Sequence, residues 1–128
     1  MALLPLNVFK TKTSILTTDP TTKIYTAPVG TTSIVLMANA ANIDQETPHL
    51  VSFAHHRNLP ILPDTQGNGG QGGNVTTEQV LNYAIPTNNA ASLLSGKMII
   101  ESLDSVIAYA DADGVIKMTL SILETANA

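Results

Sequence analysis

The sequence predicts an all-β protein, an antiparallel β-sandwich of immunoglobulin-like or jelly-roll-like type with about eight strands. Three observations predict it. Apolar and polar residues alternate with a period of two, turn residues separate short runs of β-branched residues, and no window of a dozen residues shows a helical stripe. A chain of 128 residues has room for one hydrophobic core, so we expect one domain.

The clearest strand begins at Val115, where the chain reads Val-Ile-Lys-Met-Thr-Leu-Ser-Ile-Leu. Side chains of a strand point alternately to its two faces, so one face of this segment is entirely apolar. The residues on that face are Ile116, Met118, Leu120 and Ile122. This pattern predicts a half-buried strand whose inward side is defined.

Similar short runs rich in β-branched residues predict the other strands. They lie at Ser14–Thr18, Lys23–Ala27, Thr32–Asn39, Leu50–His56, Gln79–Ile85, Lys97–Ser102 and Ser105–Ala110, and residues 3–10 are a further candidate. The Thr32–Asn39 run is apolar on both sides, which is typical of a central strand or of a strand that faces a neighbouring subunit.

Turn residues separate these strands. Asp19-Pro20 ends the first run, because proline has no N–H for a ladder. The segment Ala27-Pro28-Val29-Gly30 fits a β-turn with Pro28 at its second position and Gly30 at its fourth. Asp113-Gly114 predicts a tight hairpin between the strand that ends at Ala110 and the last strand.

Two segments fall outside this regular pattern. Residues 1–20 are predicted to be an extended N-terminal arm or the first strands, and residues 21–128 the single sandwich domain with a flexible Pro/Gly-rich loop at 59–77. Both segments are predicted to contact other subunits through apolar side chains. The candidate contacts are Leu3, Leu4, Leu6, Val8 and Phe9 in the first segment and Leu59, Ile61 and Leu62 in the second.

The composition is poor in charge. Charged residues make up 12% of the chain, about half the usual share, and the net charge is −4. The six basic residues are scattered, which argues against nucleic-acid binding.

The absence of cysteine excludes disulfides and thiolate metal sites. No apolar stretch reaches the roughly 20 residues that span a bilayer, and the N-terminus lacks a basic leader, so we expect neither a membrane contact nor export by a signal peptide.

Three patterns suggest ligand binding, and each has a simpler interpretation. The glycine-rich stretch within 59–77 lacks the Lys-Ser/Thr ending and the following helix of a phosphate-binding loop. His49, His55 and His56 are too far apart along a strand, or on opposite faces, to bind one metal ion. Asp111-Ala112-Asp113-Gly114 lacks the later ligands of a calcium loop, and a turn explains it. We therefore predict no catalytic, cofactor-binding or metal-binding residue.

Two segments resemble a known family. Lys23-Ile24-Tyr25-Thr26-Ala27-Pro28-Val29-Gly30-Thr31-Thr32-Ser33-Ile34-Val35-Leu36 resembles the Tyr-Thr-Ala-Pro-x-Gly-Thr-Thr opening of small virion structural proteins of tailed bacteriophages. The C-terminal strands are also similar to theirs, so the resemblance covers roughly residues 22–56 and 79–124. The family has Gly-Asp before the run that begins at Ser105, whereas this chain has Leu103-Asp104, which predicts a differently built bend.

The resemblance implies a non-enzymatic virion protein that decorates or cements the capsid, or belongs to the neck or tail. Its implied partners are copies of itself and other virion proteins such as the major capsid protein, and its implied location is the virion, assembled in the host cytoplasm. One alternative is a receptor- or glycan-binding module of a phage fibre or baseplate, which needs exposed aromatic residues such as Tyr25, Tyr83 and Tyr109. Tyr83 and Tyr109 lie in apolar strands, where we expect core or interface positions. A small hydrolase or lyase is the other alternative, and no polar constellation supports it.

Overall fold

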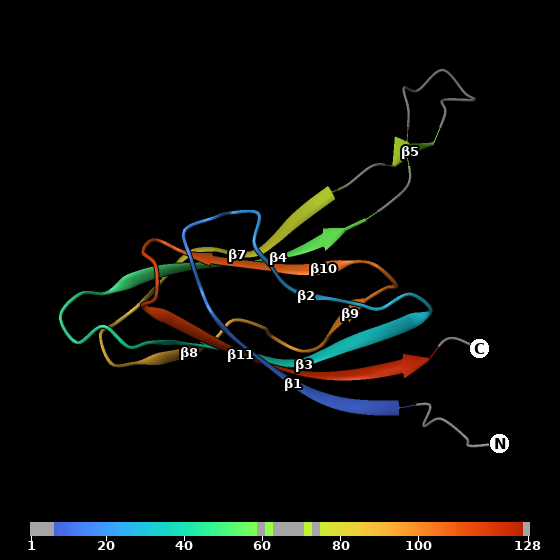
Figure 1. Ribbon diagram of the computed structural model, residues 1–128. Helices are drawn as coiled ribbons and strands as arrows, with labels where there is room; N and C mark the ends of the chain where they lie inside the picture. Colours follow the sequence, from blue (N-terminus) through green and yellow to red (C-terminus); the bar gives the residue numbers. More distant parts are fainter. Residues whose placement is uncertain (1–6, 59–60, 63–70, 73–74, 127–128) are drawn as a thin grey trace.

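The computed structural model describes residues 7–58, 61–62, 71–72 and 75–126, which form two antiparallel sheets packed face to face (Figure 1). The predicted all-β sandwich is confirmed. The described residues contain no helix, and so none that could span a membrane. In chain order the strands are β1 (Asn7–Ile15), β2 (Lys23–Thr26), β3 (Thr31–Asn42), β4 (His49–Arg57), β5 (Ile61–Leu62), β6 (Gln71–Gly72), β7 (Val75–Ile85), β8 (Ala90–Ser92), β9 (Met98–Ile100), β10 (Ser105–Ala110) and β11 (Ile116–Ala126).

The first sheet has the order β1-β11-β3-β8, and β9 also pairs with β3. The second sheet has the order β2-β10-β4-β7. β5 and β6 pair with each other and continue the β4–β7 hairpin beyond the sandwich (Figure 1). The chain therefore changes sheets six times, at the β1–β2, β2–β3, β3–β4, β7–β8, β9–β10 and β10–β11 connections.

The core lies between the two sheets. The apolar face predicted for the last strand is confirmed, because Ile116, Met118, Leu120 and Ile122 are each exposed by no more than 1%. They face Phe53 and other fully buried side chains of the second sheet. Burying one large aliphatic or aromatic side chain contributes roughly 1.5–3 kcal/mol, so this layer is the main source of stability.

Residues 7–15 form a first strand rather than a free arm. β1 pairs with β11 along its whole length, from Asn7 opposite Thr125 to Ile15 opposite Lys117. The strand predicted at Ser14–Thr18 is wrong, because the chain leaves the sheet after Ile15 and crosses to β2. β1 was hard to place because an edge strand is solvated on both faces, so its sequence alternates weakly. Residues 1–6, with Leu3, Leu4 and Leu6, lie outside the described residues.

The loop predicted at 59–77 is shorter than expected. Residues 75–77 already belong to β7 and pair with β4, beginning with Val75 opposite Arg57. Within the described part of the segment, Ile61 pairs with Gly72 and Leu62 with Gln71. The predicted contact residue Leu59 lies outside the described residues.

Two turns differ from prediction. Asp113-Gly114 does not close a hairpin, because β10 lies in the second sheet and β11 in the first. The Asp113 carboxylate instead accepts a 2.9 Å hydrogen bond from the N–H of Thr18, which explains this acidic turn without a calcium ion. The second β-turn is shifted by one residue, since the N–H of Thr31 donates to the carbonyl of Pro28. That shift places Gly30, with a φ of 75°, where a positive φ is required.

The bend before β10 places Leu103 in a backbone conformation that glycine adopts more readily than leucine. Its φ is 71°, in the left-handed region, and the N–H of Asp104 closes the turn on the carbonyl of Glu101 at 2.9 Å. A leucine in this conformation costs of order 1 kcal/mol or more. Leu103 therefore bears backbone strain at this bend.

Candidate functional site

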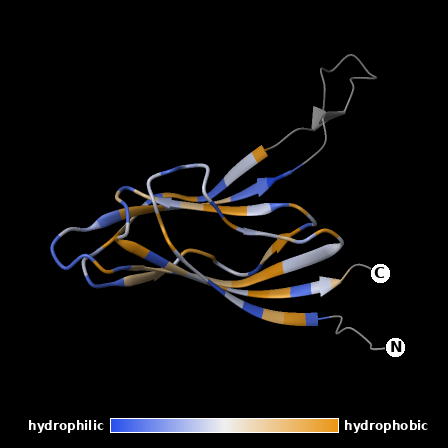
Figure 2. Cartoon of the chain, viewed as in Figure 1, coloured by the Kyte–Doolittle hydropathy of each residue, from blue (hydrophilic) through white to orange (hydrophobic). Residues whose placement is uncertain are grey.

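The outer face of the first sheet carries a row of apolar side chains that crosses four strands. In the register of the sheet, Phe9 lies opposite Leu123, Leu123 opposite Ile34, and Ile34 opposite Ile99. We call these four residues the apolar row. Phe9 is 75% exposed and Ile99 is 58% exposed, so the two ends of the row face solvent. Figure 2 shows the hydrophobic segments of β1, β3 and β11 that contribute to this face.

The rest of this face is polar but nearly uncharged. Side chains at alternate positions from the apolar row point to the same side of the sheet. They are Asn7, Thr11, Thr13 and Ile15 on β1, Lys117, Thr119, Ser121 and Thr125 on β11, Thr32, Met37, Asn39 and Ala41 on β3, and Ala90 and Ser92 on β8. Lys117 is the single charged residue among them. A free protein surface usually has about a quarter to a third of charged residues, so this face has the chemistry of an interface.

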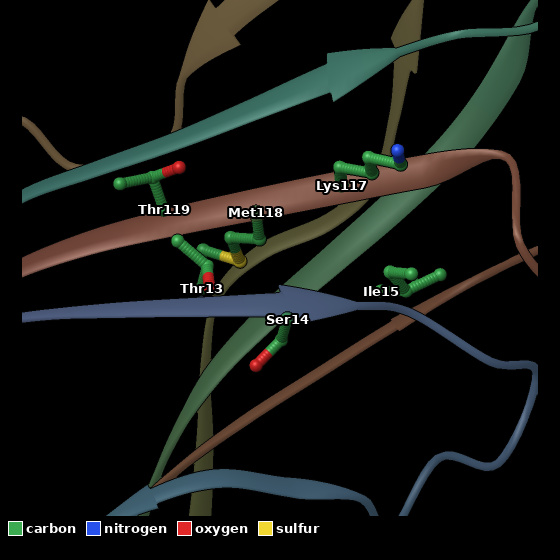
Figure 3. A pocket seen from close by; sticks show the side chains of 6 residues that line it. All are labelled: Thr13, Ser14, Ile15, Lys117, Met118 and Thr119. Carbon is green, nitrogen blue, oxygen red and sulfur yellow. The ribbon is translucent and has the colours of Figure 1, made fainter.

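A hollow of about 460 Å³ lies between β1 and β11. It is lined by Thr13, Ser14, Ile15, Lys117, Met118 and Thr119 (Figure 3). This lining has one ionisable group, the amine of Lys117, so it offers no acid–base pair.

A buried polar network lies behind the apolar row, on the core side of the same strands. The hydroxyl of Tyr25 in β2 lies 2.6 Å from Oγ of Ser33 in β3 and donates to Oε2 of Glu124 in β11. Oε1 of Glu124 also pairs with Nζ of Lys10 at 3.1 Å. Burial, together with the hydrogen bond to Glu124, raises the pKa of Tyr25 to about 12. Ser33 and Glu124 neighbour Ile34 and Leu123 in the chain, so the network holds the strands that present the row.

The predicted contact residues are only partly brought together. Phe9 belongs to the apolar row, whereas Val8 points to the other side of β1, opposite Glu124, and is 37% exposed. Ile61 and Leu62 lie in β5, which extends from the second sheet and not from the face with the row (Figure 1). Sequence analysis missed Ile34, Ile99 and Leu123. The sequence did show that the Thr32–Asn39 strand is apolar on both faces, and Ile34 is one of the side chains that make its outer face apolar.

The tyrosines do not form one exposed aromatic surface. Tyr25 is buried and its hydroxyl is engaged, while Tyr83 on β7 is 49% exposed and Tyr109 is partly buried. The core position considered for Tyr83 is therefore wrong, because β7 is an edge strand with one open side.

His49 connects the two turns at the other end of the sandwich. Its Nε2 lies 2.8 Å from Oδ2 of Asp44, and its Nδ1 lies 2.8 Å from Oδ1 of Asp111. An ionised carboxylate only accepts hydrogen bonds, so both contacts are satisfied when the ring is in its imidazolium form. The hydrogen bond that the ring donates to Asp44 raises the pKa of His49 against the effect of burial, and His49 in turn lowers the pKa of Asp44.

Asp104 anchors the base of the β4–β7 hairpin. It is 2% exposed, and its Oδ1 accepts a 2.9 Å hydrogen bond from the N–H of Asn58. Its Oδ2 lies 3.4 Å from Nε of Arg57 and 3.5 Å from Nε2 of His55. Arg57 also pairs with Glu101. No group of three metal-ligating side chains suited to an ion occurs within the ranges that the structure describes.

Comparison with known proteins adds one structural likeness. No protein-family model matches the sequence, and no match was found among curated proteins. The chain is similar in structure to a chain of the T13 IBDV viral particle, with 9% sequence identity and a TM-score of 0.45. The likeness covers 96% of this chain and 32% of that chain, so this protein spans about a third of the length of the protein it matches.

Proposed function

We propose that the protein is a non-enzymatic structural subunit of a virus particle, and more closely a decoration or cement protein of a tailed bacteriophage. In this role the outer face of the first sheet contacts other virion proteins, such as the major capsid protein, or further copies of the chain. The observation that supports the proposal is the apolar row, Phe9–Leu123–Ile34–Ile99, on a face where β1, β3, β8 and β11 contribute one charged residue, Lys117.

The size of the face fits this role. Paired strands lie about 4.8 Å apart and rise about 3.3 Å per residue, so β1, β11 and β3 together present about 430 Å² in projection over nine residues. The corrugated area is larger, and β8 and β9 add to it. A standard interface buries about 800 Å² of accessible surface on each partner. One such contact would therefore cover most of this face.

The family resemblance supports the finer part of the proposal. The segment similar to phage virion proteins, residues 23–36, forms β2, the Pro28–Thr31 turn and the start of β3, and it includes Ile34 of the apolar row. The same segment supplies Tyr25 and Ser33 of the buried network. The resemblance therefore falls on residues that build the candidate surface.

A capsid-binding experiment tests the proposal. The purified protein is added to capsids of the virus that encodes it, isolated without it, beside the double variant Phe9→Ser/Ile99→Thr and the control Val29→Thr/Ile43→Thr. The control also removes two exposed apolar side chains, but away from the row. Loss of two buried anchors of roughly 1.5–3 kcal/mol each predicts at least about a hundredfold weaker binding for the row variant only.

The receptor- or glycan-binding alternative makes the opposite prediction. It rests on the exposed ring of Tyr83 and requires saturable binding to host surface polysaccharide. If the protein binds such a polysaccharide and not the capsid, or if the row variant binds capsids as the control does, the structural role proposed here is wrong.

A further inference from the structure

The outer face of the first sheet is organised in successive rows that run across the strands. Below the apolar row, Thr13, Thr119, Asn39 and Ser92 lie opposite one another in register on β1, β11, β3 and β8. We call these four the polar row. The row nearest the β10–β11 connection is Ile15, Lys117, Ala41 and Ala90. The apolar row and the polar row are each uniform in chemistry across the sheet, whereas the row between them, Thr11, Ser121 and Met37, is mixed.

We propose that this face binds a second copy of the chain, about a two-fold axis that runs parallel to the strands. The inference rests on the same surface as the proposed function and names the partner of that surface. In this arrangement the two first sheets pack face to face about 10 Å apart, within the aligned class of sheet packing. The resulting dimer is isologous, because the same patch is used by both copies.

The orientation follows from the order of residues within the rows. An axis parallel to the strands keeps every row opposite the same row of the second copy, while it reverses the order of strands. Phe9 then faces the partner's Ile99, and Leu123 faces the partner's Ile34. A large side chain therefore meets a smaller one at both edges, which keeps the gap between the sheets even. In the polar row, Thr13 faces the partner's Ser92, and Thr119 faces the partner's Asn39, where hydroxyl and amide groups form hydrogen bonds.

The other face-to-face arrangement has its axis along the apolar row, and it is less favourable. It sets Phe9 against the partner's Phe9 and Ile99 against the partner's Ile99, so the gap would be wide at one edge and narrow at the other. In this arrangement the polar row lies to one side of the axis, and the rotation places it opposite a point beyond the end of the partner's sheet. This arrangement therefore buries less of the face and leaves the polar row without partners.

Charge favours a second copy over a charged partner. On this face β1, β3, β8 and β11 contribute one amine and no carboxylate, which gives no complementary pattern for an acidic or basic surface, whereas two nearly neutral faces match each other. Lys117 lies at the margin of the face, near the β10–β11 connection, so its amine stays in water when the sheets pack.

The absence of cysteine from the chain permits a direct test. Thr13→Cys and Ser92→Cys are prepared as separate variants, since both positions are exposed and lie outside the apolar row. Each alone, and the two mixed, are treated with a short thiol-to-thiol crosslinker, and sedimentation velocity gives the mass of the wild-type protein. The matched control mixes Thr13→Cys with Gln45→Cys, which lies at an exposed position of the turn between β3 and β4.

The proposal predicts a wild-type dimer and a crosslinked heterodimer from the Thr13→Cys and Ser92→Cys mixture. Adding Phe9→Ser to both variants should weaken the dimer at least about tenfold and lower the yield in parallel. A wild-type monomer at all concentrations, or crosslinking of Thr13→Cys mainly to itself, overturns the proposal. Capsid binding that depends on the row in a protein that never dimerises would overturn this inference and leave the structural role intact.

Discussion

The hydroxyl of Tyr25 donates a 2.5 Å hydrogen bond to Oε2 of Glu124, a residue 99 positions away in the chain and in the other sheet. This bond crosses the core directly behind the apolar row, since Leu123 precedes Glu124 and points to the opposite side of β11. A buried polar group is stabilising only when its partners are present. The network therefore fixes the alignment of β2, β3 and β11 and so the surface that they present.

Tyr25→Phe removes this hydroxyl and keeps the ring. Glu124 loses one of its partners and Ser33 another, so the free energy of unfolding should fall by about 1–3 kcal/mol in urea denaturation. Tyr83→Phe is the matched control, because that exposed ring has no comparable role, and its effect should stay within about 0.5 kcal/mol. Equal stability of the two variants would show that the network contributes nothing.

The stability of the protein should depend on pH through His49. Its pKa is raised in the folded state above the usual 6.5, so its contribution is fully present below pH 6.5 and is lost as pH rises through the folded-state pKa. Asp44 has a lowered pKa, so its contribution is present above its unfolded value of 3.8 and is lost as pH falls through the folded-state pKa. Urea denaturation should therefore show greatest stability between these two limits.

His49→Gln is the control for this pH dependence. It keeps a side chain that donates a hydrogen bond but cannot titrate, so the decline of stability above pH 6.5 should become shallower. His55 and His56 remain in this variant and report the background. An unchanged pH profile would contradict the assigned ion pairs with Asp44 and Asp111.

Leu103→Gly should stabilise the protein. The residue has a φ of 71° and is 43% exposed, so glycine removes backbone strain while little packing is lost. Glycine also costs roughly 0.5–1 kcal/mol through the freedom of the unfolded chain, which leaves an expected net gain of about 0.5–1 kcal/mol in thermal unfolding. Leu103→Ala keeps the strain and should give no gain. A loss of stability in Leu103→Gly would mean that its side chain packs better than its exposure indicates.

Asp104→Ala should loosen the base of the β4–β7 hairpin. The change removes the buried carboxylate that lies beside Arg57 and His55 and leaves the N–H of Asn58 without a partner, with an expected loss of about 1–3 kcal/mol. Hydrogen exchange should rise first at Asn58 and along the adjoining ends of β4 and β7. Glu101→Gln, at an exposed partner of the same arginine, should cost no more than about 1 kcal/mol. Similar losses of stability in both variants would contradict the conclusion that Asp104 anchors the base of this hairpin.

Local alternation was sufficient to predict the strands with one strongly apolar face. β11 is the clearest case, because Ile116, Met118, Leu120 and Ile122 stand out from the polar residues between them and all four are buried. β1 was placed poorly for the opposite reason. It is an edge strand, and Lys10 and Lys12 occupy its core-facing positions, opposite Ile122 and Leu120, so no apolar period marks its inner side.

Chain composition and periodicity alone establish an all-β protein with a cysteine-free core and a surface short of charge. They do not establish that Phe9, Ile34, Ile99 and Leu123 form one row, that His49 lies between two carboxylates, or that Tyr25 reaches Glu124. The physical reason is that alternation reflects each strand's own neighbours along the chain. Which strands lie side by side, and in which register, depends on hydrogen bonds and packing between segments far apart in sequence, and those contacts exist only in the folded molecule.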